Sequence, residues 1–152
     1  VTKPGSVSRC PILSIDYAPT IAEVAGGSMT GIDGRSFVRA LQGAQHIGRD
    51  EMFWHYPHYS PQQGKPAAAL RRGDDKLILF FEDDHVELYD LANDIGERDD
   101  LAATQPEKAA SMRRRLEEWL RETDAQIPRP NPRYDPVRER ERGPPSGPVP
   151  AK

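Results

Sequence analysis

The sequence predicts an α+β fold, in which a four-stranded antiparallel sheet packs against a C-terminal helix and is preceded by a short strand and helical segments. Three observations indicate this fold. Four β-prone segments follow one another between residues 52 and 91, with short polar turns between the last three. A long amphipathic helix comes next, and shorter strand-like and helix-like segments precede residue 46. We therefore expect three regions: residues 1–45, residues 46–127 and a tail at 128–152.

The first region predicts a buried strand followed by two helices. The run 10–15 is apolar enough for a short strand, and Asp16 offers a side-chain acceptor to the free amides of a following helix. Apolar residues then recur at helical spacing, and two glycines supply a left-handed stop, which places this helix at about 17–25. A second short helix is expected over 36–41, after a polar turn.

The second region predicts an antiparallel meander. Residues 52–56 are aromatic and β-prone, and the following loop, 57–66, is rich in Pro, Gln and Gly. Three further strands are expected at 67–72, 76–81 and 86–91. Their connections are too short for a crossover, so neighbouring strands must run in opposite directions.

The C-terminal helix is predicted by a capping box and an apolar stripe. Thr104, with Glu107 three residues later, forms the box, and the helix should run to about Thr123. Its apolar stripe faces the sheet and consists of Ala109, Met112, Leu116, Trp119 and Leu120. Beyond Ile127 the chain is dominated by Pro, Arg, Gly and Glu without periodicity, so we expect residues 128–152 to be largely disordered.

Composition excludes several function classes. The 24 acidic and 21 basic residues leave a formal charge of −3, which provides no global field toward nucleic acid or an anionic membrane. No stretch approaches the roughly 20 apolar residues needed to span a bilayer. The single cysteine, Cys10, excludes an internal disulfide and a cysteine-rich metal site. Because the first residue is Val1, we expect the chain to begin within a larger fold.

Three stretches of the sequence, taken together and in order, resemble the C-terminal end of the sulfatase family of arylsulfatase type. They cover about residues 1–127 and depart from the family pattern at Ile95, where the family usually has proline. The stretches are Ser14–Ile21 with Ala25-Gly26 and Asp33–Ser36, then Phe53–Tyr59, and then Ala69–Arg71 with Gly73–Ile78, Val86–Leu91 and Asp94–Glu97.

The resemblance implies a fold, a chemistry and a compartment. Residues 1–45 would be the last strand and helix of an alkaline-phosphatase-like α/β catalytic domain, and residues 46–127 the smaller C-terminal subdomain. Family members hydrolyse sulfate esters with a formylglycine nucleophile and calcium, and they act in the periplasm or outside the cell. None of these groups can be placed here. Cys10 lacks the surrounding motif, and the acidic pairs lie in turns, so we expect no catalytic residue, no metal site and no activity from this chain alone.

By the same resemblance, the loop after residue 55 borders the substrate cleft. His55, His58, Gln62 and Lys65 are the residues that we expect to hydrogen-bond a sulfated small molecule or carbohydrate, and His58 is the first candidate for substrate selection. In a strand, residues three apart point to opposite faces, so the two histidines should not chelate one metal ion. The alternative for this segment is that its aromatic and imidazole rings only pack the domain junction, which is the more frequent role of such a cluster.

Three functions stay open at this point. The first is a C-terminal fragment of a sulfatase, whose partners are a sulfated substrate and the rest of the catalytic domain. The second is a fragment of a related phosphodiesterase or phosphonate hydrolase, which would use a different nucleophile on a similar scaffold. The third is a non-catalytic carbohydrate-binding module that uses the segment from His55 to Lys65.

Overall fold

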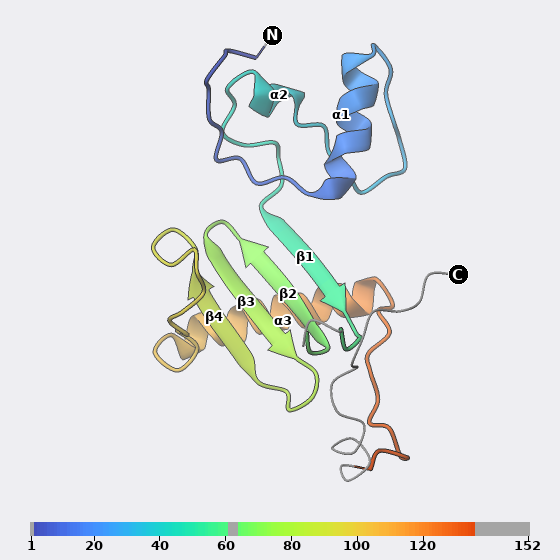
Figure 1. Ribbon diagram of the computed structural model, residues 1–152, viewed down its shortest axis with the longest axis vertical. Coiled ribbons are helices and arrows are strands. Elements are labelled where there is room, and N and C mark those ends of the chain that lie inside the picture. Colours follow the sequence, from blue (N-terminus) through green and yellow to red (C-terminus); the bar gives the residue numbers. More distant parts are fainter. Residues whose placement is uncertain (1, 61–63, 136–152) are drawn as a thin grey trace, which may run out of the picture. The chain divides into compact units, whose positions relative to one another are not determined.

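The computed structural model describes residues 2–60 and 64–135, and the chain divides into two compact units (Figure 1). The N-terminal unit comprises residues 1–50, and the C-terminal unit begins at Glu51. Each is described below by itself. Within the described residues, no helix is both long and apolar enough to cross a membrane. The part of the predicted tail at 136–152 lies outside the described residues.

Three short helical elements form the N-terminal unit. A 3-10 turn, η1 (Ser14–Asp16), leads directly into helix α1 (Tyr17–Val24), and a single turn, α2 (Val38–Leu41), follows. The predictions of helices at 17–25 and 36–41 are therefore confirmed, the first within one residue and the second in shortened form.

The strand predicted at residues 10–15 is wrong. The chain is irregular from Cys10 to Leu13 and turns into η1 at Ser14. Two local features explain the difference. Pro11 has no amide to donate to a ladder, and the Leu13 amide donates instead to the Asp16 carboxylate, at 2.7 Å. A strand also needs a neighbour, and the described part of this unit contains none.

Asp16 forms the centre of the N-terminal unit and is completely buried. Its carboxylate accepts hydrogen bonds from the backbone amides of Leu13 and Arg35, at 2.7 and 2.8 Å, and from two nitrogens of the Arg49 guanidinium, at 2.5 and 2.7 Å. Burial raises the pKa of this carboxyl group, but the hydrogen bonds from Arg49 and the two amides outweigh it and lower the pKa to about 2. Asp16 therefore joins three separate segments of the unit.

The prediction that the Asp16 side chain caps α1 is wrong, because no side-chain cap bond forms at this helix. Instead, Thr20 ties the first turn of the helix to the segment that follows: its hydroxyl donates to the Asp16 carbonyl oxygen at 2.6 Å and accepts the Phe37 amide at 3.0 Å. Gly34 permits the close approach of these segments, since a Cβ atom there would lie 2.1 Å from the Ile15 carbonyl oxygen.

The C-terminal unit contains the predicted meander. Its strands are β1 (Glu51–Tyr56), β2 (Ala67–Arg72), β3 (Asp75–Phe80) and β4 (Val86–Asp90), paired antiparallel in that order (Figure 1). All four strand predictions are confirmed, with boundaries that differ by at most one residue. In the tight connection between β2 and β3, Gly73 has φ 61°, a left-handed backbone that glycine adopts without strain.

Helix α3 (Pro106–Glu122) covers one face of the sheet and crosses behind the strands in Figure 1. The predicted stripe is confirmed, because Leu116 and its neighbours pack against strand residues in a single core. The buried members of that core are Ala68, Leu70, Leu77, Leu79, Leu88, Ala109, Met112, Leu116 and Leu120, and Trp119 packs against them. At roughly 25 cal/mol per Å² of apolar area, this core is the main stabilising contribution to the unit.

The predicted capping box at the start of α3 is wrong. The helix begins at Pro106, two residues after Thr104, and no side chain caps it. The Thr104 hydroxyl donates to the Leu101 carbonyl oxygen, at 3.2 Å, as part of a preceding turn. Proline suits the first helical position because its φ is already helical and its missing amide would have no partner there.

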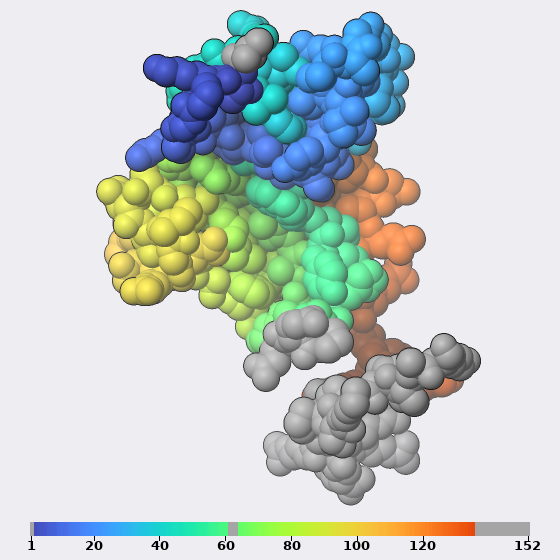
Figure 2. Space-filling view, turned by 45° about the horizontal axis from the view of Figure 1, so that its top comes forward, coloured from blue at the N-terminus to red at the C-terminus, as the bar shows by residue number. Residues whose placement is uncertain are grey.

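Part of the face of the sheet opposite α3 is also apolar. The strand register aligns one row across it, Trp54–Ala69–Ile78, and a second, Tyr56–Ala67–Phe80. A sheet with one wetted face ordinarily carries polar residues there. In the space-filling view the strands are visible in green between the yellow connections and the orange helix (Figure 2).

Candidate substrate-binding site

His55 lies on β1 and faces α3. Its Nε2 is 3.0 Å from the Gln126 carbonyl oxygen, and its ring meets the Phe81 ring edge-on, with centroids 5.6 Å apart. Since a carbonyl oxygen only accepts, Nε2 must carry the proton, which leaves Nδ1 as an acceptor. That Nδ1 atom is buried and has no hydrogen-bond partner within the described residues. The imidazole thus attaches the segment after α3 to the sheet.

His58 lies beyond the end of β1 and is exposed. Its ring stands edge-on to the Tyr56 ring, at a centroid distance of 5.7 Å. Across residues 2–60 and 64–135, no group hydrogen-bonds its ring nitrogens. The structure therefore places the two histidines in different environments: His55 is engaged against α3, whereas His58 offers its nitrogens to solvent.

Lys65 stands at the other end of the same loop and forms an ion pair with Glu82, at 2.9 Å. The Tyr59 hydroxyl donates to the other oxygen of that carboxylate, at 2.7 Å. The hydrogen bond from Lys65, followed by that from Tyr59, lowers the pKa of Glu82, and the same carboxylate raises the pKa of Lys65. Both charges persist through the neutral pH range. The sequence alone placed Glu82 in a turn and gave no sign that the loop would return to it.

The loop is closed by a short backbone bridge. The Ser60 amide donates to the Gly64 carbonyl oxygen at 3.0 Å, and the Gly64 amide donates to the Ser60 hydroxyl at 2.9 Å. A Cβ atom at Gly64 would lie 2.6 Å from that hydroxyl oxygen, so a larger residue there would displace the Ser60 hydroxyl from this hydrogen bond. Gln62, the remaining candidate residue, falls in 61–63, outside the described residues.

Aromatic side chains surround the start of the loop. Trp54, Tyr56 and Tyr59 are 41%, 49% and 69% exposed, so these three rings are not part of the core of the C-terminal unit. Phe53 takes the packing role instead, stacked on Trp119 of α3 with ring centroids 4.7 Å apart. The exposed rings present flat apolar faces of the kind that stack on sugars.

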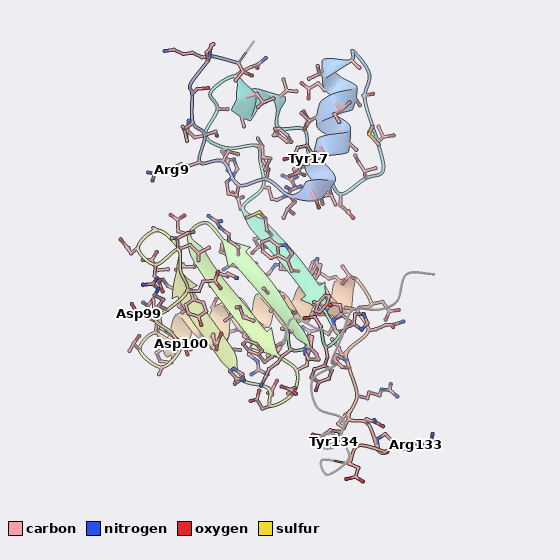
Figure 3. All side chains as sticks on the ribbon, in the orientation of Figure 1. Arg9, Tyr17, Asp99, Asp100, Arg133 and Tyr134 are labelled. Carbon is pink, nitrogen blue, oxygen red and sulfur yellow. The ribbon has the colours of Figure 1, made fainter. Side chains whose placement is uncertain are left out.

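Several charged side chains elsewhere in the C-terminal unit have structural partners. Arg72 and Lys76 form ion pairs with Glu51 and Glu97, both at 2.6 Å. Asp99 and Asp100 lie on the connection after β4 (Figure 3), and the Asp100 carboxylate accepts the Leu88 amide, at 2.9 Å.

The metal and nucleophile implied by the family resemblance do not fit the residues present. Over residues 2–60 and 64–135, no group of three or more His, Cys, Asp and Glu side chains is arranged to hold a metal ion. Asp16 is fully engaged by Arg49 and two amides. Cys10 is partly buried in irregular chain, with its sulfur 3.9 Å from the Pro11 carbonyl oxygen. The described residues of the candidate site carry aromatic faces, one open imidazole and one ammonium group.

Comparison with known proteins identifies what this arrangement is similar to. Residues 1–126 match the family described as N-sulphoglucosamine sulphohydrolase, C-terminal. A sulfatase of Formosa agariphila is 33% identical over 82% of this chain and 26% of its own length. An N-acetylglucosamine-6-O-sulfatase of Bacteroides thetaiotaomicron is 29% identical over 82% of this chain and 23% of its own length. The chain therefore spans about a quarter of the length of these relatives.

A solved structure supports the same relationship. It is 28% identical, with a TM-score of 0.59 over 73% of this chain and 24% of that one, and it is described as a complex with its substrate, D-glucosamine-2-N,6-O-disulfate. That homologue binds a sulfated carbohydrate. The sheet-and-helix arrangement of the C-terminal unit is accordingly the C-terminal subdomain of this family.

Proposed function

This chain belongs to the sulfatase family, as its C-terminal region, and from that premise we propose that it is part of an enzyme that hydrolyses sulfate esters of carbohydrates. The observation that carries the proposal is the family match over residues 1–126, which extends through both units. The chain contributes binding groups to the substrate cleft, whereas the groups that break the sulfur–oxygen bond belong to the preceding part of the longer enzyme.

The proposed substrate is a sulfated sugar, and the chemistry of the loop supports it. Exposed Trp54 and Tyr56 suit an apolar sugar face. The open imidazole of His58 and the ammonium group of Lys65 suit sulfate oxygens, which accept charge-assisted hydrogen bonds. The relatives named for N-acetylglucosamine-6-O-sulfatase activity and for a glucosamine disulfate complex point to sulfated amino sugars first.

The proposed macromolecular partner is the rest of the catalytic domain, of which residues 1–45 would be the last piece. Support comes from α1, where Tyr17, Ile21 and Val24 are 54%, 66% and 72% exposed although they share one side of the helix. Apolar residues at helical spacing ordinarily face a core. The formylglycine and calcium of the family would reside in that preceding domain, and the family's habit supports a periplasmic or secreted enzyme.

The experiment uses the longer protein that contains this chain, produced in a host that forms formylglycine. Release of inorganic sulfate is measured with D-glucosamine-2-N,6-O-disulfate and with N-acetylglucosamine 6-sulfate. We expect His58→Ala to raise KM about tenfold or more, because a hydrogen bond to a charged group is lost. His46→Ala is the matched control, since His46 is exposed in the N-terminal unit and bonded to Asp50; it should stay within about twofold, as surface changes usually do.

Three outcomes would contradict this proposal. Unchanged kinetics in His58→Ala would remove the loop from substrate selection. Hydrolysis of phosphodiesters or phosphonates without sulfate release would favour the related hydrolases. Turnover of an aryl sulfate by the 152-residue chain alone would show that catalytic groups reside here after all.

A further inference from the structure

Both ends of the 57–66 loop converge on a single carboxylate. Tyr59, which precedes the loop tip, donates to Glu82 Oε1 at 2.7 Å, and Lys65, which follows the tip, lies 2.9 Å from Glu82 Oε2. Each oxygen of the carboxylate therefore holds one end of the loop.

Glu82 itself is set on a rigid base. It follows the last residues of β3, where the Phe81 amide donates to the Pro66 carbonyl oxygen at 3.0 Å and the Phe80 amide to the His85 carbonyl oxygen at 3.0 Å. These backbone bonds fix the chain before Glu82 and close the turn after it, at the end of β3. The Glu82 carboxylate is attached to this base by a shorter side chain than that of lysine, which has a flexible four-carbon stem.

We propose that Glu82 is a positioning residue, which holds Tyr59 and Lys65 so that the loop presents Lys65 and His58 to the sulfate group of the substrate. An ammonium group has three N–H donors, and Glu82 occupies one of them, so two remain for sulfate oxygens. The inference rests on the proposed function for the identity of the ligand. The claim that Glu82 orders the loop rests only on its contacts with Tyr59 and Lys65.

The charge of Glu82 and its positioning role affect sulfate binding in opposite directions, so the proposal can be tested. A carboxylate beside an anion-binding lysine repels the anion, so its removal should strengthen sulfate binding if Glu82 contributes charge alone. If Glu82 positions the loop, its removal should weaken binding although a negative charge has gone. The direction of the change therefore separates the two roles.

The test is Glu82→Gln in the 152-residue chain, with Asp83→Asn as the matched control. Both remove one negative charge from adjacent positions, but Asp83 pairs with His85 rather than with the loop. The probe is D-glucosamine-2-N,6-O-disulfate, titrated by calorimetry. We expect roughly tenfold weaker binding for Glu82→Gln, the size of one lost charge-assisted hydrogen bond, and unchanged or slightly tighter binding for Asp83→Asn.

Hydrogen exchange provides a second measurement that needs no ligand. The amides of Ser60 and Gly64 form the bridge that closes the loop. We expect them to exchange about tenfold faster or more in Glu82→Gln, since the loop opens more often, and at the wild-type rate in Asp83→Asn. Tyr59→Phe, which removes one of the two attachments, should show a smaller increase.

The two measurements distinguish failure of this inference from failure of the proposed function. Wild-type exchange in Glu82→Gln, or tighter sulfate binding by that variant, would overturn the positioning role. If the wild-type chain binds no sulfated sugar while Glu82→Gln still accelerates exchange, Glu82 orders the loop and the proposed ligand is wrong.

Discussion

The two units of the chain have opposite interiors. At the centre of the N-terminal unit is a charged carboxylate, Asp16, which is 0% exposed, while apolar Ile21 and Val24 face outward. At the centre of the C-terminal unit are apolar side chains such as Leu77 and Leu116, which are likewise 0% exposed. One chain therefore contains two consecutive units, the first built around the buried Asp16–Arg49 pair and the second around an apolar core.

The stability of the two units therefore depends on single residues to different degrees. An apolar core spreads its stabilisation over many contacts, each worth little, so it degrades gradually. A buried ion pair concentrates its effect, because loss of one partner leaves the other charge without compensation. With only 50 residues, the N-terminal unit is near the size below which a chain rarely builds a sufficient core. Its order should therefore be the more sensitive to a single substitution.

The largest effect is expected from Asp16→Asn. The substitution leaves the Arg49 guanidinium, which is 8% exposed, without its counter-charge and turns an amide NH₂ toward groups that are donors. Breaking a buried pair in this way costs roughly 3–5 kcal/mol. The measurement is hydrogen exchange at the Leu13, Arg35 and Phe37 amides, which should lose most of their protection.

The C-terminal unit serves as the internal reference for that experiment. Both tryptophans, Trp54 and Trp119, lie in it, so urea denaturation followed by tryptophan fluorescence reports this unit. We expect its midpoint to be unchanged in Asp16→Asn. The matched substitution is Asp84→Asn, which breaks an exposed pair with Arg113 and keeps a residue type that tolerates the φ of 60° there; such pairs contribute less than about 1 kcal/mol. If Asp84→Asn destabilised the C-terminal unit as much as Asp16→Asn destabilises the N-terminal unit, the contrast between the units would be refuted.

Leu116→Ala should produce the next largest effect, this time in the C-terminal unit. Truncation of a fully buried leucine removes apolar contacts and leaves a cavity, at a cost of about 2–5 kcal/mol. The fluorescence midpoint in urea should fall accordingly, while exchange at the Leu13 and Arg35 amides stays at the wild-type rate. Ile95→Ala is the control, because Ile95 is 80% exposed. A shift in N-terminal exchange would show that the two units do not unfold independently.

The same contrast explains how much of the fold could be predicted from the sequence. The four strands and α3 are marked by local periodicity, and their boundaries were predicted within one or two residues. The strand expected at 10–15 rested on a short apolar run alone, and the caps expected from Asp16 and Thr104 depended on single polar side chains. Such a side chain chooses among several partners, and Asp16 bonds to Arg49, 33 residues away. Sequence patterns do not specify that choice.

For the candidate site, the sequence indicated a segment but not its contacts. Aromatic and imidazole residues before a Pro- and Gly-rich loop marked that segment, and its role in binding stays a prediction. The engagement of His55 by the Gln126 carbonyl oxygen, 71 residues away, and the return of the loop to Glu82 could not be read from spacing. Both depend on how the meander folds back on itself, so a residue's place in a motif did not reveal whether its polar atoms are already used.

Acid should destabilise the N-terminal unit, and this is the smallest of the expected effects. The pKa of Asp16 is about 2 in the folded chain, below its ordinary value of 3.8. A carboxyl group whose pKa is lowered by folding stabilises the protein above its unfolded pKa. That contribution is lost as pH falls from about 4 to about 2, and its size is about 2 kcal/mol. Exchange protection at the Arg35 amide, corrected for the intrinsic rate, should fall across this range in the wild-type chain and show little dependence on pH in Asp16→Asn. A comparable decline in both proteins would show that protonation of another carboxylate, not of Asp16, causes the acid sensitivity of the N-terminal unit.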